Sequence, residues 1–319
     1  MLVKQFKFSY PKNILILIFL ALAVQIPCFI FPNINVEINS SAPIMRLVSS
    51  LFNFSPLLTG ILFSVFLGVT ILIIDKTNKD NILISKTSLL PPAVYSILFG
   101  LSLYNSNIIL GLLLSACICR LLEIATKEGS FENYYMSSGV FAGIAFLMDI
   151  NAYIVLLIII ISLFITKRFN LRYLLIILTG FILPILIWVI ILFFQNRLEE
   201  LIFFLQTLKI NFAFFHFEYS TSKLIYLIAF VIIILFSSIF VFLKFNTMNN
   251  PTKTKYSLLI FVTLSCLLLV FISNNPLFYI MLSFPALSIL ISFVLNNLKL
   301  LYADIFFSLL LLLPILLLF

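Results

Sequence analysis

The sequence predicts an all-α fold: a polytopic transmembrane helix bundle of about eleven spans, with an additional helix lying in the outer interface. First, its 319 residues are 63% hydrophobic and 9% charged, whereas a soluble domain carries roughly 25% charged residues. Second, the apolar runs are nearly continuous, since only Ser162 interrupts residues 154–165. Third, the basic residues gather in alternate gaps between these runs.

A chain this apolar cannot cover a surface that faces water, so we expect lipid to be its solvent. Its backbone polar groups must then be hydrogen-bonded internally, in a helix bundle or a closed barrel. Barrel strands would alternate apolar and polar residues, which the continuous runs do not. We therefore expect residues 1–319 to form a single integral membrane domain of helices.

The spans follow from the apolar runs in order. The first run comes after Lys4, Lys7 and Lys12, and no small-residue cleavage site follows it, so we interpret it as an uncleaved span. Two pairs of runs have very short links, which are typical of tight helical hairpins or re-entrant pairs. The expected spans are 13–31, 56–74, 89–104, 106–124, 135–150, 152–166, 173–194, 223–243, 256–273, 276–295 and 300–319.

The basic residues predict the orientation. With a cytoplasmic N-terminus and alternating spans, fifteen of the 19 Lys and Arg residues fall in cytoplasmic gaps or inner span ends. The exceptions are Arg46, Arg197, Lys209 and Lys223. Such an excess of Lys and Arg in the cytoplasmic loops is typical of multi-pass membrane proteins and determines their orientation.

Two outer segments are longer than turns. Residues 32–56 contain Glu37, and residues 195–223 begin with apolar residues at helical spacing, which predicts a helix in the outer interface. The apolar residues are Leu198, Leu201, Ile202, Leu205 and Leu208.

The composition limits partners and cofactors. The net charge of +8 lies in short gaps, which favours contact with anionic membrane lipids and excludes a nucleic-acid module. The four cysteines lie in or beside spans and the only histidine is His216, so we expect no metal site and no cofactor. No nucleotide-binding or nucleophile-elbow motif is present, and the sequence identifies no protein partner.

Ionisable residues at membrane depth are the candidates for chemistry. Arg120 and Glu123 share a helix face near an inner span end, either as a boundary ion pair or as a site where Arg120 binds a lipid headgroup or substrate phosphate. Asp149 lies at an outer hairpin tip, where it either caps the next helix or joins an outer site. Asp304, one turn into the last span, is interpreted as a boundary residue.

An outer carboxylate, Glu37 or Asp149, could act as general base for sugar transfer from a lipid phosphate that Arg197 binds. The alternative is that these are solvated loop charges; Glu199, Glu200, His216 and Glu218 are other charges of the same side. Separately, Gly139 and Gly143 form a G-x-x-x-G that predicts close packing of helices within the chain.

Five segments carry a resemblance to a known family: Ser88-Leu89-Leu90-Pro91, Arg120-Leu121-Leu122-Glu123-Ile124, Ser138 to Leu147 with its two glycines, Lys167-Arg168-Phe169-Asn170-Leu171-Arg172, and Thr179-Gly180-Phe181-Ile182-Leu183-Pro184. Over about residues 75–195 the chain is similar to bacterial multi-pass inner-membrane proteins without an established activity, some of which carry the label beta-carotene monooxygenase. The resemblance implies an inner-membrane location. The oxygenase label would need iron held by several histidines, and the chain has one.

The layout of many spans and a long first outer loop with an acidic residue also resembles membrane glycosyltransferases that use polyprenyl-phosphate-linked sugars. By that likeness Glu37 is the candidate base, although it stands alone where an acidic pair or an Asp is commoner. The sequence thus leaves two hypotheses: a lipid-linked sugar transferase, or a non-catalytic scaffold or transporter subunit.

Overall fold

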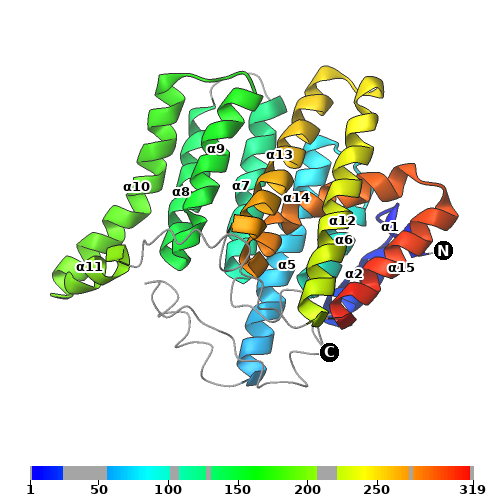
Figure 1. The fold of residues 1–319 in the computed structure, drawn as a ribbon, viewed down its shortest axis with the longest axis horizontal. Coiled ribbons are helices and arrows are strands. Elements are labelled where there is room, and N and C mark those ends of the chain that lie inside the picture. The colour runs from blue at the N-terminus through cyan, green and yellow to red at the C-terminus, as the bar shows by residue number, and fades with distance from the viewer. Residues whose placement is uncertain are drawn as a thin grey trace.

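The computed structural model describes residues 2–23, 56–100, 108–126, 131–206, 221–272 and 276–316. The structure is 88% helical and the described residues contain no strand, which confirms the predicted all-α class. Figure 1 shows several long helices standing side by side, with α1, α2 and α15 gathered at one flank. The helices are α1 Leu2–Phe6, α2 Pro11–Ala23, α5 Pro56–Asn81, α6 Leu90–Gly100, α7 Ile108–Thr126, α8 Glu132–Met148, η1 Ile150–Ala152, α9 Tyr153–Ile165, α10 Leu171–Phe194, α11 Glu199–Gln206, α12 Thr221–Leu243, η2 Phe245–Thr247, α13 Asn250–Ile272, α14 Pro276–Asn297 and α15 Leu300–Leu316.

Within the described residues, four helical segments are long and apolar enough to cross a membrane, which indicates a membrane protein. They are Leu171–Phe194, Leu224–Thr247, Asn250–Phe271 and Tyr279–Asn297. Shorter apolar helices occupy Pro11–Ala23, Leu90–Phe99, Tyr153–Ile165 and Leu300–Leu312. Each of the eleven predicted spans overlaps a helix, although residues 24–31, 101–104, 106–107, 273 and 317–319 of these spans lie outside the described ranges. The number of helices that span the membrane stays a prediction.

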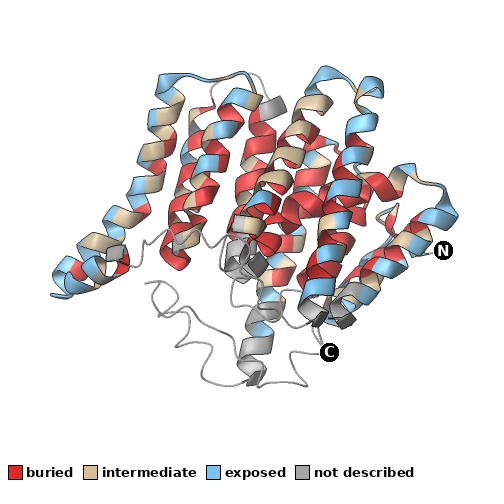
Figure 2. Ribbon diagram, viewed as in Figure 1, coloured by how far each residue is buried: buried red, intermediate tan, exposed pale blue. Residues whose placement is uncertain are grey.

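Helix α14 forms the centre of the bundle. It packs against α6, α7, α12 and α13. Of its most apolar stretch of 18 residues, 89% is buried inside the bundle (Figure 2). Its Ser283, Ser288 and Ser292 hydroxyls donate hydrogen bonds to carbonyls of the same helix, so their polar groups are satisfied in the core.

Helix α10 is mostly exposed, since only 17% of its most apolar stretch of 18 residues is buried inside the bundle. Leu186, Ile190 and Phe193 are among the large side chains that it exposes. In water such a face would be an interaction or aggregation surface, whereas lipid accepts it without cost.

Three glycines allow α8 and α10 to pack closely. A Cβ atom on Gly139 or Gly143 would lie less than 3.0 Å from the carbonyl oxygen of Ile177 or Phe181. A Cβ atom on Gly180 of α10 would meet the carbonyl oxygen of Met136 in the same way. The predicted role of the G-x-x-x-G in packing within the chain is confirmed.

Two of the predicted cytoplasmic turns, α9–α10 and α12–α13, lie at the upper edge of Figure 1, whereas α11 lies at the lower edge. Contacts join other predicted cytoplasmic gaps. The Lys255 Nζ of α13 donates to the carbonyl oxygen of Asn81 at 2.6 Å, and Arg172 of α10 pairs with Glu132 of α8 at 2.7 Å. Four of the basic gaps therefore lie at one end of the bundle: α5–α6, α7–α8, α9–α10 and α12–α13.

Candidate functional site

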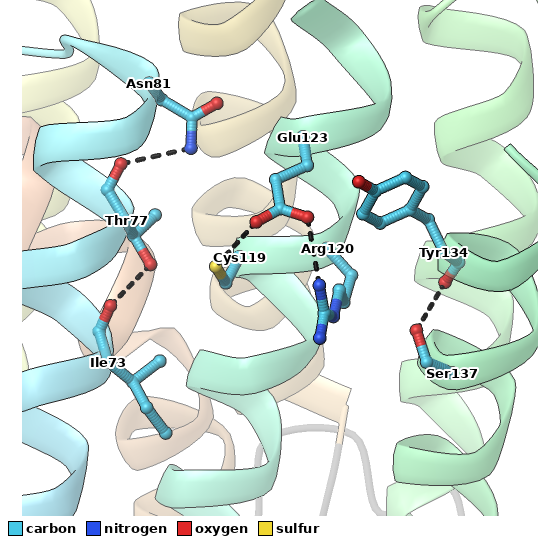
Figure 3. A network of polar contacts seen from close by, with 8 residues as sticks. All are labelled: Ile73, Thr77, Asn81, Cys119, Arg120, Glu123, Tyr134 and Ser137. Carbon is cyan, nitrogen blue, oxygen red and sulfur yellow. Dashed lines mark hydrogen bonds and ion pairs between the residues drawn. The ribbon is translucent and has the colours of Figure 1, made fainter. Parts of the chain in front are cut away.

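The polar network in Figure 3 lies between α5, α7 and α8, and we call it the α7 site: Thr77, Cys119, Arg120, Glu123 and Tyr134. Arg120 and Glu123 lie one turn apart on α7, and their Nη1 and Oε2 atoms are 3.0 Å apart. The Arg120 side chain is 41% exposed and that of Glu123 only 6%. The prediction that Arg120 and Glu123 share a helix face is confirmed. The Glu123 carboxylate of this ion pair is buried in the bundle, and the Arg120 guanidinium is partly exposed.

The buried carboxylate of Glu123 has two hydrogen-bond partners on its own helix, Cys119 and Arg120. Cys119 Sγ donates to Glu123 Oε1 at 3.8 Å, on the side away from Arg120. Thr77 of α5 faces this group (Figure 3), and its hydroxyl donates to the carbonyl oxygen of Ile73. A buried carboxylate without such partners would be costly. Because its oxygens are already hydrogen-bonded, we interpret Glu123 as the residue that orients the Arg120 side chain, and not as a reactive group.

Helix α8 completes the site on the exposed side of Arg120. The Arg120 Cζ atom lies 5.6 Å from the centroid of the Tyr134 ring, within the range of a cation–π contact. Ser137, one turn further along α8, donates to the carbonyl oxygen of Tyr134 at 3.0 Å. Figure 3 shows both residues opposite Arg120.

An open groove of about 270 Å³ runs along the same part of α8. It is lined by Asn133, Met136, Ser137, Val140 and Phe141. Since Ser137 belongs to the groove and faces Arg120, the guanidinium lies close to the polar end of an otherwise apolar surface.

Asp149 lies in the turn between α8 and η1, where it is 2% exposed. Its Oδ1 atom accepts hydrogen bonds from the backbone N–H of Asn151 at 2.9 Å and from Asn151 Nδ2 at 3.0 Å. Asp149 therefore caps the short helix η1, whereas α9, the next long helix, has Ala152 at its N-cap and no side-chain cap bond. Tyr279 of α14 lies close enough to Asp149 and Tyr153 for electrostatic interaction with both. A catalytic role for Asp149 stays a prediction.

Arg197 lies between α10 and α11 and pairs with Glu200 three residues later, while its side chain stays 56% exposed. The predicted helix here is confirmed as α11. Phe204 of α11 packs on Phe146 of α8 and Trp188 of α10, with ring centroids 5.5 and 5.6 Å apart. The sequence pattern did not identify Phe204, because a contact made by a single aromatic residue of a short helix produces no repeat in the sequence.

The candidates form two groups rather than one site. Arg120 faces Tyr134 near the start of α8, whereas Asp149 follows its last residue. Seventeen helical residues separate these ends, a length of about 25 Å. Asp149 and Arg197 share the end of the bundle where α11 lies. Glu37, His216 and Glu218 lie outside the described residues.

The described residues contain no cluster of three His, Cys, Asp or Glu side chains that could hold a metal ion. Comparisons of the chain with family models, curated proteins and solved structures found no match. The function is therefore argued from the chain's own geometry.

Proposed function

We propose that the chain is a multi-pass protein of the bacterial inner membrane, with eleven spans and a cytoplasmic N-terminus. Four membrane-length apolar helices support this proposal, as does the gathering of predicted cytoplasmic gaps at one end of the bundle through the Lys255–Asn81 and Arg172–Glu132 contacts. Basic residues concentrated on one side are the usual determinant of orientation.

Single-cysteine variants in intact cells test the topology, in a background whose native cysteines are replaced by serine or alanine. Lys167→Cys and Lys253→Cys are expected to react with an impermeant maleimide only after the cells are opened. Glu199→Cys, in the first turn of α11, is expected to react in intact cells. Labelling of Lys167→Cys and Lys253→Cys on opposite sides would contradict the proposal.

For its activity we propose transfer of a sugar from a polyprenyl-phosphate donor at the outer end of the bundle. The observation that carries this proposal is the nearly buried carboxylate of Asp149, held in one orientation by Asn151. In the proposed reaction an outer carboxylate, Asp149 or Glu37, removes the proton of the acceptor hydroxyl, and Arg197 balances charge on the leaving phosphate.

Transfer of radiolabelled sugar from polyprenyl phosphate to a lipid or glycan acceptor, in proteoliposomes, tests this activity. Asp149→Asn and Glu37→Ala are compared with Glu199→Gln, a carboxylate of the same end that has no assigned role. We expect at least a hundredfold loss for the variant that removes the general base, within the usual range for such groups. Equal transfer by all variants would end the role of both carboxylates.

A specific observation favours a second candidate, a non-catalytic membrane scaffold. Arg120, Arg197 and Asp149 are each paired with a neighbour at most three residues away, as expected of charges that serve structure. A stable partner that purifies with the chain in mild detergent, together with no transfer activity, would favour the scaffold. We rank transport below both, because transporters place ionisable residues in broken helices at mid-membrane.

A further inference from the structure

We propose that Arg120 and the groove on α8 form a binding site for an anionic phospholipid of the cytoplasmic leaflet. The leaflet rests on the topology proposed above, whereas the site itself rests on the geometry of α7 and α8. It is independent of any transferase activity at the other end of the bundle.

The polar half of the site is a cation that its ion pair leaves accessible. Glu123 engages one edge of the Arg120 guanidinium, and the side chain keeps 41% of its surface exposed. The Tyr134 ring supports the guanidinium from α8 at 5.6 Å. A guanidinium has five N–H donors in a planar fork that suits phosphate oxygens, and the hydrogen bond to Glu123, among the described residues, engages only Nη1, which leaves donors for a ligand.

The groove residues change from polar to apolar along α8. The polar lining residues Asn133 and Ser137 belong to the first two turns of α8, with Met136 beside them, and Ser137 lies opposite Arg120 (Figure 3); Val140 and Phe141 line the groove further along the helix. From residue 133 to residue 141 the helix rises about 12 Å. This order matches a phospholipid that enters with its phosphate at Arg120 and lays its acyl chain on Val140 and Phe141.

More positive charge lies around the same end of α8. Arg172 pairs with Glu132 but keeps 70% of its side chain exposed. Arg168 lies over the Phe131 ring, with its Cζ atom 3.8 Å from the centroid. Cations at the cytoplasmic edge attract anionic headgroups, so this charge favours a phospholipid over an uncharged lipid or an apolar protein helix.

Native mass spectrometry of the delipidated protein in detergent tests the proposal, with phosphatidylglycerol or phosphatidylcholine added at equal concentration. We expect phosphatidylglycerol to bind more tightly. The double variant Arg120→Gln/Glu123→Gln removes the cation without leaving a buried carboxylate unpaired, and is expected to weaken phosphatidylglycerol binding about fivefold. Val140→Trp fills the groove without changing charge and is expected to weaken binding of the same lipid.

The matched control is Lys244→Gln, which removes an exposed cation at the start of η2, on a segment that contributes nothing to the groove. It is expected to leave phosphatidylglycerol binding unchanged. Equal affinity for both lipids, or binding that neither the Arg120 double variant nor Val140→Trp reduces, overturns the proposal. So does a dimer that Val140→Trp disrupts while lipid binding persists. Because this binding is measured in detergent, a wrong topology or an absent transferase activity would leave its result unaffected.

Discussion

The Tyr256 hydroxyl of α13 donates a hydrogen bond of 2.7 Å to the carbonyl oxygen of Leu83, in the loop between α5 and α6. One residue earlier, the buried Lys255 ammonium donates to the carbonyl oxygen of Asn81, the last residue of α5. A cation at the carbonyl end of a helix is favourable. The first turns of α13 thus hold the end of a helix that lies far away in the sequence.

Tyr256→Phe is expected to destabilise the protein by about 1–3 kcal/mol, because the buried Leu83 carbonyl loses its hydrogen-bond donor. The ring remains, and with it the packing on Phe293. Thermal unfolding in detergent, followed by fluorescence of the single tryptophan Trp188, measures the change. Tyr302→Phe alters an exposed tyrosine and serves as control; equal losses in both variants would contradict the role of the Tyr256 bond.

Asn78 is expected to hold the α5–α6 loop closed. Its Nδ2 atom donates to the carbonyl oxygens of Ser85 and Ser88, and its Oδ1 atom accepts from the Ile84 backbone N–H. Asn78→Ala loses all three bonds, so trypsin should cut faster after the exposed Lys86.

Two variants make the loop experiment specific. Asn78→Asp retains the acceptor for Ile84 but places a buried carboxylate against the Ser85 and Ser88 carbonyl oxygens, so it should be cut at least as fast as Asn78→Ala. Asn297→Ala removes an exposed amide that donates to the carbonyl oxygen of Phe293 in α14, and should leave the rate of cutting unchanged. A rate for Asn78→Ala no higher than that for Asn297→Ala would rule out this role of Asn78.

Gly143→Ala is expected to destabilise the α8–α10 packing by about 1–3 kcal/mol, because its Cβ would collide with backbone of α10 and the helices must separate. Trp188 lies on α10 and reports this change in its fluorescence. Gly68→Ala on α5 is the matched control, since its Cβ meets nothing within 4 Å. Replacing that helical glycine is expected to stabilise by up to about 1 kcal/mol; an equal loss in both variants would refute the close crossing.

The sequence predicts those features that depend on local periodicity. The apolar runs place a helix at each predicted span because helix formation in an apolar environment needs only the chain's own backbone bonds. The Arg120–Glu123 pair and the G-x-x-x-G follow from the same 3.6-residue spacing. Capping by Asp149 is also local, because its acceptor bonds reach only Asn151.

Contacts between distant segments leave no such pattern. Lys255 and Asn81 are separated by 174 positions, and Lys255 contributed to the prediction only as one of many cytoplasmic charges. The groove on α8 exists because α8 turns its glycine face to α10 and leaves Asn133 and Met136 exposed. Which helix covers which face is decided by packing in three dimensions, so this part of the candidate site needed the structure.

The role of Asp304 also depends on a contact between segments that are distant in the sequence. The sequence suggested only a boundary residue, whereas the structure shows its Oδ1 atom accepting from the backbone N–H of Val3 at 2.8 Å. This bond holds α1 on α15, where Phe6 packs against Phe307 with ring centroids 5.7 Å apart. Asp304→Ala leaves the Val3 N–H without its acceptor, a loss of about 1.5–3 kcal/mol for a bond to a charged group.

Local release of α1 should follow, with cutting by trypsin after Lys4 and Lys7 at least tenfold faster than in the wild type. Asp304→Asn retains an oxygen acceptor and is expected to lie closer to the wild type. Asp80→Ala removes an exposed carboxylate from α5 and controls for the loss of charge. If Asp304→Ala is cut no faster than Asp80→Ala, the Val3 bond does not hold α1, and the Phe6–Phe307 packing must do so alone.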